Sequence, residues 1–188
     1  MNKSTLAWLV VALVVIAAAI AFLSYKTAEA PVVPPSSQGQ GAFDGKNATF
    51  TIDGASVTLS GGVSEVSAAP GSASMITTRY FGNEATGDLN GDGLPDVAFL
   101  ITQDTGGSGL FYYAVAAIQT TSGYKTTNAF LIGDRIAPQS TYIPINSQEI
   151  QVNYAERKPG EPMTAQPSVG ATLLLKVTSA GVLEGLMR

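Results

Sequence analysis

Nine residues, Asp88 to Asp96, have side chains and spacing that suit a calcium ion. Ca²⁺ takes about six to eight oxygen ligands, and acidic or amide side chains at alternate positions of a tight loop can converge on one point. Gly93 stands at the sixth position, where such a loop turns sharply. We therefore predict a Ca²⁺ site whose ligands are the side chains of Asp88, Asn90, Asp92 and Asp96 and the main-chain carbonyl of Leu94.

The charge of this loop and the residues that the chain lacks both favour calcium. Closely spaced carboxylates repel one another unless a cation compensates them. The chain contains no Cys and no His, and oxygen-only ligation favours Ca²⁺ over transition metals. The same absences exclude disulfides, thiol nucleophiles and imidazole-based triads. The alternative is a metal-free turn at the start of a strand, in which Asp and Asn side chains bond to their own backbone.

Asp88 to Asp96 resembles the DxNxDGxxD calcium loop of FG-GAP repeats, dockerins and thrombospondin-type repeats. Phe99 occupies the position at which an EF-hand carries a bidentate Glu, and residues 97–101 are predicted to form a strand. The loop is therefore more similar to the strand-linked FG-GAP form, and this resemblance implies that Asp96 closes the site. The pattern occurs once in the chain, which excludes a propeller of repeats.

The elements that must position this loop are predicted to be strands. In residues 48–52 and 55–59 apolar side chains alternate with Thr or Ser, and Asp53-Gly54 between them is typical of a type I′ hairpin turn. Pairing Ile52 with Ala55 places every apolar side chain on one face. The sequence therefore predicts a hairpin with a fixed register.

The rest of the chain beyond the hairpin also shows strand periodicity. No window after residue 30 has a helical stripe longer than about two turns. We expect one antiparallel all-β domain over residues 42–188, built as a curved sheet, a sandwich or a partial barrel. The further predicted strands are Ser74–Phe81, Asp96–Thr102, Phe111–Gln119, Thr126–Ile132, Glu149–Ala155, Ala171–Thr178 and Val182–Leu186, the last two forming a second hairpin.

The N-terminal part has a different composition. Leu6 to Leu23 are eighteen consecutive residues without a charge, about the length that crosses a bilayer. We predict a transmembrane anchor over residues 1–26 and a Pro-rich tether over residues 27–41. Lys3 before the span favours a cytoplasmic N-terminus and an extracytoplasmic C-terminal domain at the cell membrane. The alternative is a signal peptide cleaved after Ala30, although the apolar run exceeds the usual length of about 7 to 15 residues.

A wider resemblance supports this organisation. Residues 81–118, 131–136 and 152–163 resemble a group of uncharacterised bacterial proteins that have one N-terminal membrane span and a small extracytoplasmic domain. The resemblance covers most of residues 47–188 and implies location and fold. It implies no activity.

Charge and composition make some classes of function less plausible for this chain. Residues 42–188 carry eight basic and thirteen acidic side chains, so we expect no nucleic-acid partner. Our first hypothesis is a non-enzymatic, membrane-anchored module with structural calcium and a possible protein partner. The alternatives are a carboxylate-dependent hydrolase of cell-envelope polymers and a pilus-like subunit. The only Trp is Trp8, which weakens a sugar-binding role, and the prolines of the tether disfavour the long helix of a pilin.

Overall fold

The computed structural model describes residues 42–186. The predicted anchor and tether, residues 1–26 and 27–41, lie outside the described residues. Residues 42–186 fold into antiparallel β-sheets with one short 3₁₀ helix, η2 (Gly45–Asn47). The prediction of an antiparallel all-β fold is confirmed. Within these residues no helix has the length and apolar character needed to cross a membrane.

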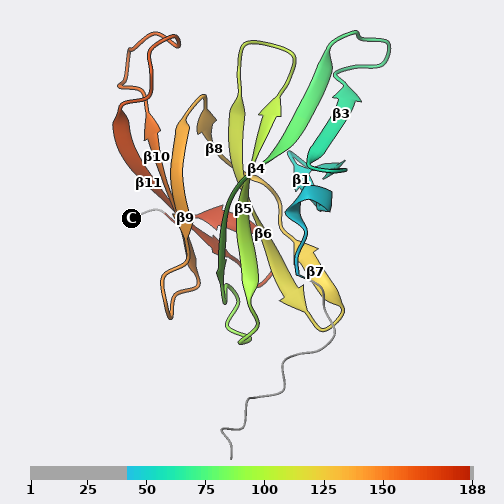
Figure 1. Cartoon of the computed structure of the whole chain (residues 1–188), viewed down its shortest axis with the longest axis vertical. Coiled ribbons are helices and arrows are strands. Elements are labelled where there is room, and N and C mark those ends of the chain that lie inside the picture. Colours follow the sequence, from blue (N-terminus) through green and yellow to red (C-terminus); the bar gives the residue numbers. More distant parts are fainter. Residues whose placement is uncertain (1–41, 187–188) are drawn as a thin grey trace, which may run out of the picture. The chain divides into compact units, whose positions relative to one another are not determined.

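The largest sheet supplies the centre of the fold (Figure 1). Its first five strands follow the chain order, and a sixth strand, β8, pairs with the same strand as β7 does. The strands are β3 (Val63–Ser67), β4 (Met75–Gly87), β5 (Asp96–Asp104), β6 (Phe111–Thr120), β7 (Gly123–Thr126) and β8 (Phe130–Asp134).

Two smaller sheets accompany it. One is the hairpin of β1 (Thr49–Ile52) and β2 (Ala55–Thr58). The other has four strands, adjacent to one another in chain order. These are β9 (Ala137–Tyr142), β10 (Glu149–Glu156), β11 (Val169–Val177) and β12 (Leu183–Gly185). β4 also contacts β9, so the two larger sheets meet along that side.

Two hydrophobic clusters lie on opposite faces of the main sheet. Phe99 and Ile101 of β5 pack in the cluster that the β1–β2 hairpin covers. Ala98 and Leu100 pack in the cluster shared with β10, β11 and β12. Because successive side chains of a strand point to opposite faces, burial on both sides explains the unbroken apolar run of β5. The loop predicted to bind calcium thus leads directly into the most buried strand region.

The first hairpin has the predicted register. Phe50 pairs with Val57 and Ile52 with Ala55, and Phe50 and Ile52 are buried. The two turn residues have positive φ angles, +49° at Asp53 and +81° at Gly54, as a type I′ turn requires. The second predicted hairpin, β11–β12, is also present.

Several details differ from the expected strands, and β4 also continues past the predicted end at Phe81 as far as Gly87. β3 and β9 were not predicted, and residues 126–132 contain an interruption between β7 and β8. β3 is mostly exposed and β9 contains Pro138, so neither shows clear apolar alternation. At the interruption the chain turns to another partner, since the Ala129 N–H donates to the Thr51 carbonyl on β1 at 2.7 Å. No local sequence pattern signals that long-range bond.

Candidate metal site

The predicted metal loop connects β4 with β5, two strands whose ends pair through Gly87 and Asp96. Leu89, in the first half of the loop, is buried in the cluster beneath the second sheet. Figure 1 shows the loop (green) at the same end of the sheets as the turn between β9 and β10. The loop therefore has a fixed base at both of its ends.

Asp88 is the centre of the loop's hydrogen bonds. Its carboxylate accepts the main-chain N–H groups of Gly91 at 2.7 Å, Gly93 at 2.9 Å and Asn90 at 3.3 Å. Gly91 and Gly93 have φ angles of +83° and +80°, a conformation that glycine adopts without steric cost. The bond from Gly93 is the largest influence on the pKa of Asp88. With the weaker bonds from Gly91 and Asn90 it holds this pKa below its ordinary value, although burial, the second-largest influence, opposes them.

Asn90 and Asp92 are bonded directly to each other. The Asn90 side-chain amide donates to Asp92 Oδ2 at 2.9 Å, and Asn90 Oδ1 accepts the Asp92 N–H at 3.0 Å. Asp92 Oδ1 in turn accepts the Leu94 N–H at 2.8 Å. Both side chains are exposed to solvent. The side chains at the first, third and fifth positions thus all turn toward the backbone of the loop.

Asp96 is fully buried at the base of the loop. One carboxylate oxygen accepts the Leu89 N–H and the other accepts the Gln119 N–H of β6, both at 2.8 Å. Burial raises the pKa of Asp96, the two backbone bonds oppose this, and the charges of Asp92 and Asp88 raise it further. Asp96 therefore joins the loop to the central sheet, although its burial and the neighbouring carboxylates disfavour its negative charge.

The structure places the five predicted ligand residues in one loop without gathering their carboxylates at one point. Among residues 42–186, no three or more Asp, Glu, His or Cys side chains are grouped as a metal ion would need. Each acidic side chain of the loop instead bonds to neighbouring backbone. The metal itself stays a prediction. No protein-family model, curated protein or solved structure matches the chain.

Two residues of the β9–β10 turn pack on this loop and were not anticipated. A Cβ atom added at Gly87 would lie 2.6 Å from Ile143 Cγ2, and one at Gly91 would lie 2.5 Å from Gln148 Nε2. Between the loop and the turn lies a hollow of roughly 360 Å³, lined by Asp88 and residues 143–148 among others. Gln148 thus brings an amide group against the loop. Its position follows from the pairing of distant strands, which the local sequence does not reveal.

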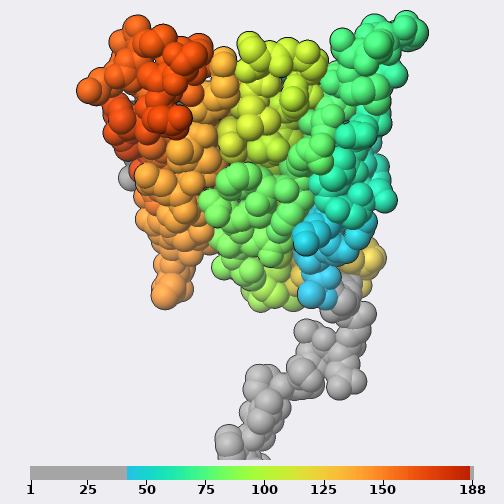
Figure 2. All heavy atoms as spheres, turned by 45° about the horizontal axis from the view of Figure 1, so that its top comes forward, coloured from blue at the N-terminus to red at the C-terminus, as the bar shows by residue number. Residues whose placement is uncertain are grey.

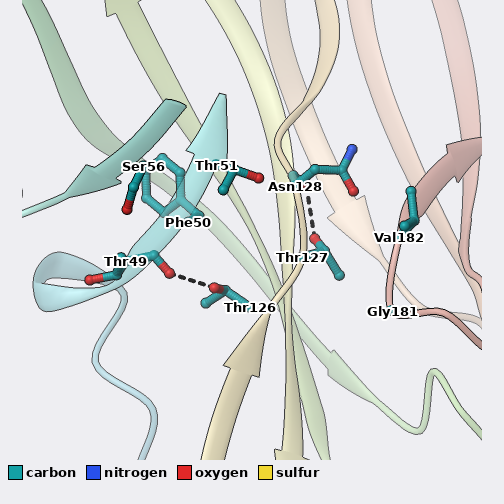
Figure 3. A pocket seen from close by; sticks show the side chains of 9 residues that line it. All are labelled: Thr49, Phe50, Thr51, Ser56, Thr126, Thr127, Asn128, Gly181 and Val182. Atoms are coloured by element: carbon teal, nitrogen blue, oxygen red, sulfur yellow. Dashed lines mark hydrogen bonds between the residues drawn. The ribbon is translucent and has the colours of Figure 1, made fainter. Parts of the chain in front are cut away.

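Two other hollows bear on the hydrolase alternative. The first, shown in Figure 3, lies beside β1, where the Thr126 hydroxyl donates to the Thr49 carbonyl. Its lining contains no acidic or basic side chain. The second includes Asn90 and Lys125 in its lining but no carboxylate. Together with the hollow beside Asp88, none of these three places two carboxylates across a cleft, as general acid and base catalysis on a glycan requires.

Proposed function

We propose that the chain is a membrane-anchored, extracytoplasmic binding or structural module in which Asp88 to Asp96 hold a structural Ca²⁺ ion. The observation that carries the metal proposal is the presence of three carboxylates in one loop with no ion pair to a basic side chain among the described residues. Burial raises the pKa of Asp96, and the charges of Asp92 and Asp88 raise it further. Among the described residues the two ion pairs, Arg79–Glu65 and Arg135–Asp134, include none of these acids. A divalent cation would remove the mutual repulsion.

The donor set fits a hard cation. The side chains of Asp88, Asn90 and Asp92 face the backbone of one loop, and we propose that they exchange some of these hydrogen bonds for contacts with the ion. The Leu94 carbonyl and Asp96 complete the predicted set. Bound there, Ca²⁺ would supply positive charge and a crosslink between the exposed loop and the buried start of β5. Extracellular modules commonly bind Ca²⁺ with dissociation constants of about 10⁻⁴ to 10⁻³ M, which suits an extracytoplasmic location.

The location is supported by the sequence of the N-terminal part. Leu6 to Leu23 are long enough and apolar enough to anchor the chain in a bilayer, and residues 27–41 have the composition of a tether. The net negative charge of residues 42–188 disfavours nucleic acid as a partner. We propose a non-enzymatic role, and the three hollows described above favour it over the hydrolase alternative, because none of them has two opposed carboxylates.

Thermal unfolding tests the calcium site. A protein consisting of residues 42–188 is suitable, because it contains both hydrophobic clusters. The melting temperature of this protein is measured in excess Ca²⁺, in excess Mg²⁺ and in chelator. Calcium at one hundred times its dissociation constant stabilises the folded state by about 2.7 kcal/mol. For a domain of this size that is a rise of roughly 5 to 11 °C in melting temperature. We expect the rise with Ca²⁺ and little with Mg²⁺.

Two variants make this test specific. Asp92→Asn keeps the shape of an exposed side chain and removes one charged ligand, so it should abolish most of the calcium-dependent rise. Asp104→Asn is the control, because Asp104 makes the same kind of turn bond, accepting the Gly106 N–H at 2.8 Å, in a different loop. The control should retain the full rise. If about 10 mM Ca²⁺ leaves the wild-type melting temperature unchanged, against the affinity range of such modules, the loop is a metal-free turn and the proposal is wrong.

A further inference from the structure

The turn between β9 and β10 exposes one large apolar side chain almost completely. Ile145 is 93% exposed, whereas the next most exposed large hydrophobic residue among those described, Val66, is 54% exposed. Ile145 occupies a β-turn closed by the Ser147 N–H, which donates to the Pro144 carbonyl at 3.0 Å. Polar residues are usual at such a position. An isoleucine there calls for a physical reason.

The exposure of Ile145 is built into an ordered turn. On one side of it Ile143 packs against Gly87, and on the other Gln148 lies against Gly91. The Glu149 N–H also donates to Ser147 Oγ at 3.1 Å. Figure 2 shows this turn as an orange projection that stands out from its neighbours. The packed base thus holds the apolar tip away from the protein.

The turn lies at the end of the sheets where the described chain begins. Phe43 packs against Tyr124 of β7 in a tilted arrangement with ring centroids 5.1 Å apart. Figure 1 shows the β6–β7 turn, the loop between β4 and β5 and the β9–β10 turn pointing the same way. The forty-one residues before this point include the apolar run Leu6 to Leu23. The β9–β10 turn therefore lies at the same end of the fold as the first described residues.

We propose that Ile145 inserts into the interface of the bilayer that anchors the chain and so orients the domain on the membrane. This inference rests on the anchor in the proposed function. One isoleucine binds lipid only weakly on its own, but a tether makes the contact intramolecular, so a weak interaction is enough. Tyr142 near the tip is 41% exposed, and tyrosine suits the headgroup region. Asp88 beside the turn repels anionic headgroups, which makes a zwitterionic surface the better first probe.

Tryptophan fluorescence of the full chain in phosphatidylcholine vesicles tests the insertion. The chain has one Trp, Trp8, and Trp8→Phe provides a background without tryptophan. Ile145→Trp is compared in that background with Val66→Trp, a matched exposed position on β3 at the opposite end of the sheet (Figure 1). Both sites are on the surface, so circular dichroism should show the same fold. With brominated acyl chains we expect at least a twofold loss of emission from I145W and little loss from V66W.

Flotation of the same samples separates the two proposals. If the chain floats with the vesicles but I145W and V66W are quenched equally, the anchor stands and the insertion of Ile145 is refuted. If the chain does not float, the anchor itself fails and the inference fails with it. A blue-shifted I145W emission that brominated lipid does not quench would show burial against protein, such as a second copy, and would also overturn the proposal. Floating chain with selective quenching of I145W supports it.

Discussion

Replacing Asn128 with alanine should remove a polar link between the β7–β8 segment of the large sheet and β12 of the four-stranded sheet. Asn128 lies between β7 and β8, and Leu183 begins β12. The Asn128 amide nitrogen donates to the Leu183 carbonyl at 3.2 Å, and the Leu183 N–H donates to Asn128 Oδ1 at 2.8 Å. The side chain therefore pairs with both backbone groups of one residue, as a neighbouring strand would.

The expected loss can be worked out from these two bonds. Each contributes about 1 kcal/mol net, and a buried N–H left without an acceptor adds about 1 kcal/mol more. Leu183 is only 1% exposed, so water cannot readily replace the lost acceptor. We expect the free energy of unfolding to fall by about 2 to 3 kcal/mol. With a urea dependence of about 2 kcal/mol per M, the unfolding midpoint falls by about 1 to 1.5 M.

Asn153→Ala is the matched control for this measurement. Asn153 also makes two side-chain hydrogen bonds, donating to Ser140 Oγ at 3.0 Å and accepting from Thr172 Oγ1 at 2.9 Å, but both are exposed on one sheet. Its loss should cost less than about 1 kcal/mol, because water replaces the missing partner. Equal midpoints for N128A and N153A would refute the argument that the Asn128 link is better protected from water than the Asn153 bonds and that it joins the two sheets.

Two further predictions concern packing and pH. Gly87→Ala should lower stability by about 1 to 3 kcal/mol, since its Cβ would lie 2.6 Å from Ile143 Cγ2, whereas Gly170→Ala, with nothing within 4 Å, should cost far less in the same urea titration. The Arg135 guanidinium, by its hydrogen bond, lowers the pKa of Asp134. This contribution to stability is complete above the unfolded-state pKa of about 3.9 and disappears as the pH falls through the lower folded-state value. Asp134→Asn should therefore flatten the acid side of the stability profile below about pH 4. If Asp134→Asn leaves the stability below about pH 4 unchanged, the pKa argument is wrong. If the two glycine variants lose the same stability, the packing argument is wrong.

Local patterns predicted the parts of the fold that depend on local chemistry. The first hairpin could be predicted because Asp53-Gly54 sets the turn and alternation sets the face, and both agree on one register. β9 could not, because Pro138 and its polar neighbours show no apolar face. Its position as an edge strand comes from pairing with β10, which has a clear pattern.

In the candidate site, too, some features could be predicted from local sequence and others depend on distant strands. Spacing identified Asp88, Asn90 and Asp92, which the structure joins by hydrogen bonds within the loop. It did not reveal that Asp96 is fully buried and bonded to Gln119 on β6, because that contact depends on the pairing of β5 with β6. Sequence reasoning therefore selected residues that share one loop but missed the contacts that hold the loop in place, and the role of these residues as metal ligands stays a prediction.

The calcium proposal and the membrane proposal concern neighbouring parts of the molecule, the loop between β4 and β5 and the β9–β10 turn that packs on it. The loop carries its charge on Asp88 and Asp92, while Gly87 and Gly91 leave room for the turn that carries Ile145. Any ion that stiffens the loop would also stiffen the surface on which that turn rests, and a preorganised contact binds more tightly than a mobile one. The same ion would reduce the negative charge beside the tip and thus the repulsion from anionic headgroups. Calcium occupancy and lipid contact are therefore expected to reinforce each other, although each can be tested and refuted alone.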